Sequence, residues 1–214
     1  MSRTRRGALI VFEGCDRSGK TTQSDLLVKH FEAKHIPVKH MKFPDRTTII
    51  GQMIDSYLRK SQELSDESIH LLFSANRWEF RNQMEKLLNS GTTLVVDRYS
   101  FSGIAYTAVK GKSFEWCKFP ERGLVKPDLV FYLKTAVNSL ESRDDFGTEI
   151  YEKGEIQKKV AKIFEEFCEK DSEYWRMIDG GRSIEAVKGD IVLEADRVLE
   201  EVKGSPIELL WPVD

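Results

Sequence analysis

The segment of residues 14–21, Gly-Cys-Asp-Arg-Ser-Gly-Lys-Thr, constrains the fold of this chain more than any other feature. It matches the pattern Gly-x-x-x-x-Gly-Lys-[Ser/Thr], a loop whose backbone cradles nucleotide phosphates. An unbroken apolar run at residues 8–12 precedes it, as in a buried strand, and apolar residues recur at helical spacing from Thr21 to about Lys34. This strand and helix context argues against a chance match in an ordinary turn. The sequence therefore predicts a nucleoside triphosphate site.

The chemistry expected of such a loop follows from its position before a helix. Backbone N–H groups and the positive end of the helix dipole face the phosphates. Lys20 is expected to reach the β- and γ-phosphates, and the Thr21 hydroxyl is expected to ligate Mg²⁺. Asp97, which closes the apolar run at residues 92–96, is the candidate to hold Mg²⁺ through water. A strand-end aspartate is often only a turn former, but together with the glycine loop the metal role is favoured.

Apolar runs and helical patterns alternate along the whole chain. The runs lie at residues 8–12, 38–43, 92–96, 129–133 and 174–178, and longer helical stripes lie at residues 65–91, 156–167 and 184–202. This alternation predicts an α/β doubly wound fold, a P-loop NTPase-type three-layer sandwich with about five parallel strands. We expect one domain over residues 1–214. Ligands of such sheets bind beyond the carboxyl ends of the strands.

Composition narrows the class of partner. The 33 basic and 35 acidic residues give no overall bias toward nucleic acid. The three cysteines, Cys15, Cys117 and Cys168, are too widely spaced for a disulfide framework or a zinc site. No apolar run approaches the length of a membrane span, and residues 8–12 are too short for a signal peptide. We expect a soluble intracellular protein with neither a nucleic acid nor a membrane partner.

Arginines gather where the strands are expected to end. Arg17 lies inside the phosphate loop, Arg46 follows the second run, and Arg98 follows Asp97. Phosphoryl transfer between two anions needs cations of this kind, so the pattern favours two phosphorylated substrates over a simple hydrolase.

Two further features leave their role open. Phe73 and Arg77 are four residues apart on one helix face, where they could stack on a base and bond its edge. Phe73 also continues an apolar stripe, so spacing alone favours a core position. The polar segment 143–154 contains two glycines and suits either a lid over the phosphates or a solvated loop.

Four blocks together, at residues 12–21, 43–46, 73–79 and 97–103, resemble the thymidylate kinase family of eukaryotic type. The similarity continues through residues 126–129 and 151–152 and covers essentially the whole chain. The resemblance implies transfer of the γ-phosphoryl group of ATP to dTMP with Mg²⁺, giving dTDP. It also implies a homodimer, a lid at about residues 143–154, and a cytoplasmic or nuclear location.

The resemblance implies a role for each matching residue. On the ATP side it implies Gly14, Arg17, Ser18, Gly19, Lys20, Thr21, Thr22, Arg143 and Arg182. On the dTMP side it implies Asp16, Phe43, Arg46, Phe73, Arg77, Arg98, Gly103, Tyr106 and Tyr151. Arg17, Lys20 and Arg98 would be catalytic.

Within the dTMP side the implied contacts are specific. Asp16 would hold the sugar 3′-hydroxyl, and Arg46 with Arg98 would grip the phosphate. Phe73 would stack on thymine while Arg77 bonds the edge of the base, which replaces the core role that spacing favours. Tyr106 would crowd the 2′ position and so favour deoxyribose.

Family members differ in whether the catalytic cation lies in the phosphate loop or in the lid, and Arg17 places this chain with the former. The segment 143–154 has Ile150 where a basic residue can occur, and it contains Asp144 and Asp145. Asp45 stands where members often have glutamate. We therefore expect Arg17 to supply the positive charge that stabilises the transition state.

Three other functions are compatible with a phosphate loop. A deoxynucleoside kinase would not need two phosphate-binding arginines such as Arg46 and Arg98. A nucleotide switch would need a guanine-reading Asn-Lys-x-Asp segment, and residues 125–128 read Val-Lys-Pro-Asp. An inactive binding protein would not need Lys20, Asp97 and Arg17 together.

Overall fold

The computed structural model describes residues 6–136, 149–151 and 154–212 of the chain. Its centre is one parallel sheet in the order β2-β3-β1-β4-β5. The strands are β1 (Leu9–Glu13), β2 (Val38–Lys42), β3 (Thr93–Asp97), β4 (Leu129–Lys134) and β5 (Trp175–Asp179). The predicted α/β fold with five parallel strands is confirmed.

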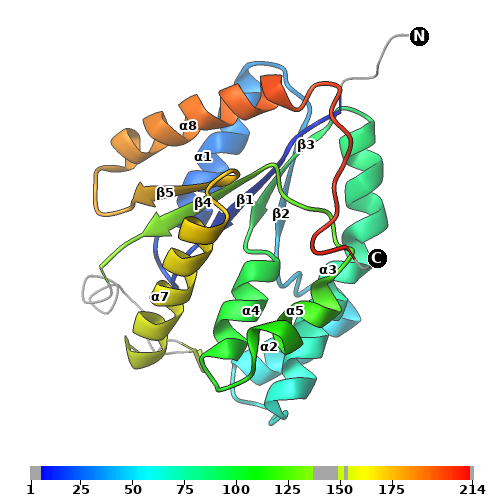
Figure 1. Cartoon of the computed structure of the whole chain (residues 1–214), viewed down its shortest axis with the longest axis vertical. Coiled ribbons are helices and arrows are strands. Elements are labelled where there is room, and N and C mark those ends of the chain that lie inside the picture. Colours follow the sequence, from blue (N-terminus) through cyan, green and yellow to red (C-terminus); the bar gives the residue numbers. More distant parts are fainter. Residues whose placement is uncertain (1–5, 137–148, 152–153, 213–214) are drawn as a thin grey trace.

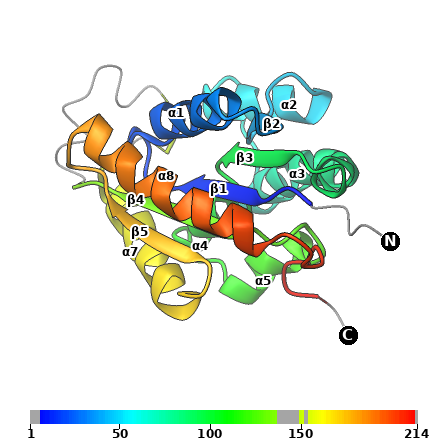
Figure 2. The same cartoon turned by 90° about the horizontal axis from the view of Figure 1, so that it is seen from above.

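Helices cover both faces of this sheet, which makes three layers (Figures 1 and 2). The helices α1 (Lys20–Ala33) and α8 (Ile184–Glu201) pack side by side on one face. The other face is covered by α3 (Asp66–Asn89), α4 (Ser100–Ala108) and α7 (Gly154–Lys170). The short elements α2 (Ile49–Leu58), α5 (Phe114–Lys118) and η1 (Phe119–Glu121) pack against α3 and α4.

The core is divided in two by the sheet, because side chains alternate along each strand. In β1, Ile10 and Phe12 pack toward α1 and α8, while Leu9 and Val11 pack toward α3, α4 and α7. All four side chains are fully buried. The unbroken apolar run before the phosphate loop therefore follows from burial on both faces.

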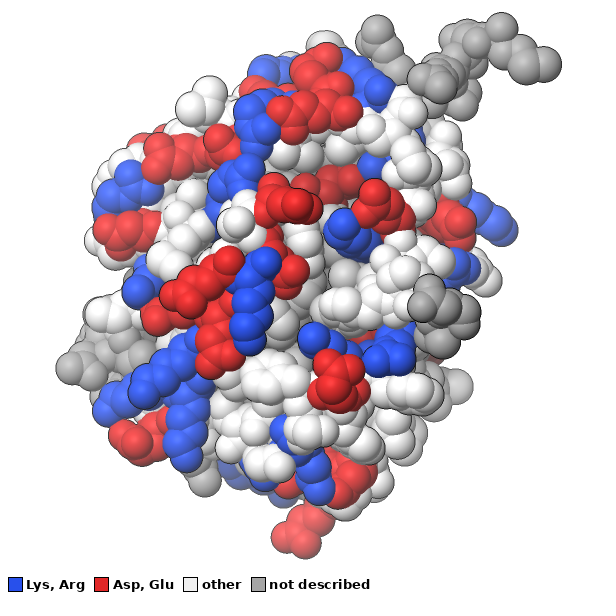
Figure 3. All heavy atoms as spheres, in the orientation of Figure 1, with Lys and Arg blue, Asp and Glu red and all other residues white. Residues whose placement is uncertain are grey.

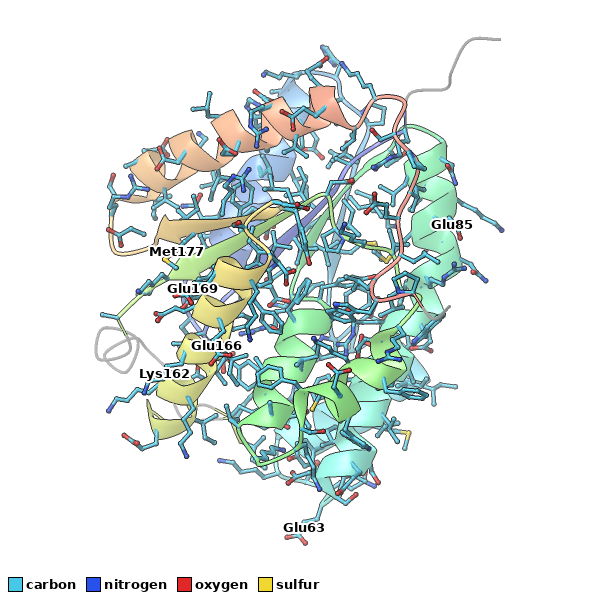
Figure 4. All side chains as sticks on the ribbon, viewed as in Figure 1. Glu63, Glu85, Lys162, Glu166, Glu169 and Met177 are labelled. Carbon is cyan, nitrogen blue, oxygen red and sulfur yellow. The ribbon has the colours of Figure 1, made fainter. Side chains whose placement is uncertain are left out.

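The helix α7 shows how an amphipathic pattern fixes an element next to the site. Its buried side chains, among them Val160 and Phe164, lie against the core. Lys162, Glu166 and Glu169 point outward from the same helix in Figure 4. Burying this apolar stripe sets the position of the amino-terminal turn of α7, where Gln157 is fully buried.

Charges of both signs alternate over the face shown in Figure 3, in agreement with the balanced composition. No helix among the described residues combines the length and the apolar character that crossing a membrane requires.

Candidate active site

A cavity of about 280 Å³ opens at the carboxyl ends of β1, β2 and β3. Most side chains that the sequence assigns to a site lie around it. They are Asp16, Arg17, Lys20, Thr21, Phe43, Arg46, Phe73, Arg77, Asp97, Arg98, Gly103, Tyr106 and Tyr151. The parallel sheet brings three of the sequence blocks together because each follows one of these strand ends, whereas Phe73 and Arg77 come from α3.

The phosphate loop is closely packed against its surroundings. Gly14 has φ +144°, and a Cβ there would lie 2.8 Å from the Leu133 carbonyl oxygen and 2.9 Å from Ser18 Oγ. Gly19, with φ +96°, precedes the first turn of α1, where Thr22 is exposed. Side chains other than hydrogen are therefore excluded at Gly14, and the backbone forms the inner wall of the loop.

Lys20 lies buried at the base of the loop. Its Nζ donates a hydrogen bond of 2.6 Å to the Cys15 carbonyl oxygen. Burial, together with the nearby Arg98 charge, lowers the pKa of Lys20 to about 8. An anion next to Nζ would raise the pKa of Lys20 again, so the charged ammonium group could bind a phosphate.

Thr21 and Asp97 form an oxygen-lined pair beside the loop. The Thr21 hydroxyl donates to Asp97 Oδ2 at 2.5 Å, and Lys42 Nζ lies 3.8 Å from the same oxygen. Asp97 Oδ1 is buried and has no hydrogen-bond partner among the described residues. A buried carboxylate oxygen without a partner beside a hydroxyl fits a hard divalent cation such as Mg²⁺.

Asp16 is the centre of a hydrogen-bond network. Its Oδ1 accepts from Arg98 Nη2 at 2.5 Å, and its Oδ2 accepts from the Tyr106 hydroxyl at 2.9 Å and from Gln157 Nε2 at 2.6 Å. Burial opposes ionisation of Asp16, but the Arg98 and Lys20 charges outweigh it and hold the pKa of this carboxyl below its usual value. Asp16 is therefore an ionised acceptor inside the cavity.

Arg98 is oriented from two sides. It has φ 69°, and its Nη1 donates to the Gly14 carbonyl oxygen and to Ser102 Oγ, both at 3.1 Å. The Ser102 hydroxyl in turn donates to the buried Glu13, which also accepts from the Tyr99 N–H at the start of α4. Burial raises the pKa of Glu13. A residue at the end of β1 thus fixes both the first turn of α4 and the arginine before it.

Arg46 lies at the outer rim of the cavity. Its Nη1 donates to Asp55 Oδ1 at 2.6 Å and its Nη2 to Glu149 Oε1 at 2.7 Å. The side chain is 39% exposed, so water competes for these contacts. Neighbouring Asp45 accepts from the Thr47 N–H and hydroxyl and does not pair with Arg46.

The apolar end of the cavity holds Phe73 and Arg77. Phe73 is partly buried, packs against the core and also lines the cavity, so it combines the two alternatives left by spacing. Arg77 is buried and pairs with the buried Glu121. Gly103 lies directly against Arg77, and the rings of Tyr106 and Tyr151 are 5.2 Å apart.

Of the residues assigned to the ATP side, Arg182 does not line the cavity. Arg182 is exposed and donates to Asp190 Oδ2 at 2.5 Å and to the Asp179 carbonyl oxygen at 3.3 Å. Arg143 lies outside the described residues, as does most of segment 143–154. Arg17, by contrast, has φ 61° within the loop and lines the cavity.

The structure adds side chains that sequence reasoning did not single out. Lys42, Leu58, Tyr99, Ser102, Thr107 and Glu149 line the same cavity, while Gln157 and Glu121 hold Asp16 and Arg77 from behind. Tyr99 and Ser102 fall inside the block at residues 97–103, so adjacency in sequence could have found them. Gln157 and Glu121 have no such local signal.

The fold and this constellation define a phosphate-loop nucleotide enzyme whose cavity extends from the loop to an aromatic end. A family model described as thymidylate kinase matches residues 12–191 of the chain. The chain is 46% identical to a thymidylate kinase of Plasmodium falciparum over 97% of each protein. It is 49% identical to one of Schizosaccharomyces pombe, over 90% of this chain and 93% of that protein.

A solved structure agrees with these sequence matches. The thymidylate kinase of Candida albicans superposes with a TM-score of 0.84 at 38% identity, covering 96% of this chain and 98% of that one. The chain belongs to the thymidylate kinase family.

Proposed function

We propose that this protein transfers the γ-phosphoryl group of ATP to dTMP and forms dTDP. The observation that supports this most directly is the single cavity that is lined by the phosphate loop, by Arg46 and Arg98, and by the aromatic side chains of Phe73, Tyr106 and Tyr151. A hydrolase would not need the aromatic part of this cavity, because water is its acceptor. Membership of the thymidylate kinase family supports the same substrates. Because both are intracellular nucleotides, the reaction belongs inside the cell.

The donor nucleotide is proposed to bind along the loop of residues 14–21. Lys20 would exchange the Cys15 carbonyl for the β- and γ-phosphates, a contact that desolvation of its ammonium group favours. Thr21 would ligate Mg²⁺ directly and Asp97 through water. The ion would neutralise charge on the phosphates. Among the described residues no cluster of three or more metal-ligating side chains exists, so the nucleotide would complete the coordination.

The acceptor is proposed to lie between Phe73 and the loop. Phe73 would stack on the base, Arg77 would donate to its edge, and Asp16 would accept from the 3′-hydroxyl. Tyr106 hydrogen-bonds Asp16 at 2.9 Å, so its ring would lie beside the sugar and would crowd a 2′-hydroxyl. Arg46 and Arg98 would bind the phosphate and place it in line with the donor.

Arg17 is proposed to act on the transferring group. It is the loop residue next to Asp16, and it lines the same cavity as Lys20, Arg46 and Arg98. A guanidinium there stabilises charge that develops on the equatorial oxygens in the transition state.

We also propose that the protein forms a homodimer. Six of the nine large exposed hydrophobic side chains in the described part of the chain lie on α2, α3, α5 and η1. They are Ile49, Met53, Leu71, Trp78, Trp116 and Phe119. Such a concentration is typical of a protein interface. Light scattering should give twice the chain mass of 24.7 kDa, and Ile49→Glu with Leu71→Glu should restore the single mass if this surface is the interface.

The activity is tested by ADP release from ATP and Mg²⁺ with dTMP, dUMP, dCMP, AMP and thymidine offered separately. We expect the fastest turnover with dTMP. Preference for thymidine would make the protein a nucleoside kinase. If the protein binds ATP but releases no ADP with any acceptor, the proposal is refuted in favour of a nucleotide switch or a binding module.

A further inference from the structure

Arg77 is locked by a carboxylate that comes from a different part of the chain. Its Nε donates to Glu121 Oε2 at 2.8 Å, and its Nη2 donates to Glu121 Oε1. The arginine side chain is 2% exposed and the glutamate 0%. This bidentate geometry fixes the plane of the guanidinium group as well as its position.

The helix that contains Arg77 also fixes the backbone that contains Glu121. Ser74 Oγ and Trp78 Nε1 both donate to the Pro120 carbonyl oxygen, at 2.9 and 2.7 Å. One turn earlier, His70 Nε2 hydrogen-bonds the Cys117 carbonyl oxygen at 3.0 Å. His70, Ser74 and Trp78 are four residues apart, so they share one face of α3. Three side chains of a single helix thus hold the backbone that places Glu121 against Arg77.

The pairing leaves a defined edge of Arg77 for a ligand. Nη1 makes no hydrogen bond within the described part of the chain, and Arg77 lines the cavity beside Phe73. Gly103 lies behind the guanidinium, where an added Cβ would be 2.5 Å from Nη2 and 3.5 Å from Nη1. The group is thereby confined on two sides and presents only N–H donors.

We propose that Glu121 is the positioning residue that makes the acceptor pocket selective for a base with a 4-carbonyl group. This inference rests on the proposed function as a dTMP kinase. Thymine and uracil offer an acceptor oxygen at this position, whereas cytosine offers an amino group that would face the N–H donors of Arg77. A buried site built to donate a hydrogen bond rejects a partner that cannot accept it. Glu121 enforces that rejection because it prevents the guanidinium from turning away.

Loss of Glu121 should therefore act on the acceptor alone. Glu121→Gln keeps the size of the side chain, removes its charge and turns an N–H group toward the N–H donors of Arg77. The arginine would lose one hydrogen bond and its fixed plane. Glu121→Asp keeps the charge at a shorter reach and should retain part of the discrimination.

The chain contains a matched control for a carboxylate-to-amide change in a buried arginine pair. Asp128 accepts from Arg6 Nη1 at 2.8 Å and from Nη2 at 2.6 Å, and its side chain is 14% exposed. This pair does not line the cavity. Asp128→Asn therefore reproduces the loss of a bidentate ion pair without touching Arg77.

The experiment measures kcat and KM for dTMP, dCMP and ATP in the wild type and in the three variants. For Glu121→Gln we expect KM for dTMP to rise at least about tenfold and the dTMP-to-dCMP ratio of kcat/KM to fall at least about tenfold, with KM for ATP within about twofold. Glu121→Asp should be intermediate, and Asp128→Asn should leave all these values within about twofold. If Glu121→Gln does not fold, the proposal is tested by the dTMP-to-dCMP ratio of kcat/KM in Glu121→Asp, compared with the same ratio in Asp128→Asn.

Equal changes in KM for dTMP and ATP, or an unchanged ratio in a folded Glu121 variant, would overturn the role of Glu121. A wild type that does not prefer dTMP would instead refute the proposed function. The wild-type acceptor series and the variant ratios therefore separate the two failures.

Discussion

Gly103→Ala adds one methyl group at the position where it should disturb the proposed acceptor pocket most. It lies in α4, a helix buried along nearly its whole length, and an added Cβ would be 2.5 Å from Arg77 Nη2 and 3.3 Å from Cζ. Non-bonded heavy atoms of this kind settle at about 3.5 Å or more. Gly103→Ala must therefore push the Arg77 guanidinium about 1 Å away from its place against Glu121.

Two opposing terms decide the stability of this variant. Alanine in a helix interior is more favourable than glycine by about 1 kcal/mol. Displacing the guanidinium leaves two buried charges incompletely paired, and the upper bound of this cost is the value of about 3–5 kcal/mol for losing one partner of a buried ion pair. We expect the second term to be larger, so Gly103→Ala should lower the free energy of unfolding, by at most about 2–4 kcal/mol, in spite of its better helix propensity.

Urea unfolding of Gly103→Ala beside Gly189→Ala provides the assay. Gly189 is an exposed glycine of α8, and an added Cβ there meets nothing within 4 Å. Gly189→Ala should therefore gain about 1 kcal/mol. In Gly103→Ala we also expect KM for dTMP to rise at least about tenfold while KM for ATP stays nearly constant, since we propose that Arg77 binds the acceptor and not ATP.

The reasoning would be refuted if Gly103→Ala were as stabilising as Gly189→Ala and left KM for dTMP unchanged. That result would mean that Arg77 shifts freely, and that its contact with Glu121 contributes neither stability nor position.

Three further predictions concern the charges around the cavity. Arg17→Gly should lower kcat by about 10³-fold, and a folded variant that loses less than tenfold in steady-state kcat would exclude a catalytic role. Arg77→Ala should raise KM for dTMP and leave that for ATP nearly unchanged, whereas equal effects on both would make Arg77 structural. Because burial lowers the pKa of Lys20 to about 8, Lys20 loses its charge above this pH in the substrate-free protein. ATP binding must then take up a proton, so affinity should fall as pH rises further. Calorimetry in buffers of different ionisation enthalpy should detect this uptake about one unit above the pKa, and its absence would contradict the shift.

The sheet could be predicted from sequence because each parallel strand is a continuous apolar run. The predicted runs differ from the observed strands by no more than about two residues at either end. The long helices α3, α7 and α8 could be predicted because each contains a stripe of apolar residues at helical spacing. Three shorter elements, α2, α4 and α5, were not predicted. In α4, residues 100–107 are all buried, so no polar face exists to reveal the helical period.

The site residues also fall into two groups, those that local sequence predicts and those that only tertiary packing places. The loop residues and Asp97 follow directly after strands, so their place at one sheet edge follows from local sequence. Glu121 and Gln157 contact residues 44 and 141 positions away, and each is an ordinary polar residue in its own segment. Only the packing of α3 on η1, and of α7 on β4 and β5, brings them to Arg77 and Asp16. Residues that orient other residues therefore escape sequence patterns more readily than residues that face the ligand.

Two arginines assigned to the acceptor side, Arg77 and Arg46, differ in how firmly a carboxylate holds them. Arg77 and Glu121 are fully buried, so separating them is costly and the pair should persist when a base binds. Arg46, at 39% exposed, holds Asp55 and Glu149 in contacts that contribute about 0–1 kcal/mol each. A doubly charged phosphate can displace such partners easily. On the proposed function, the buried pair would hold Arg77 in place for the base, whereas the exposed Arg46 would exchange Asp55 and Glu149 for the phosphate of the acceptor at little energetic cost.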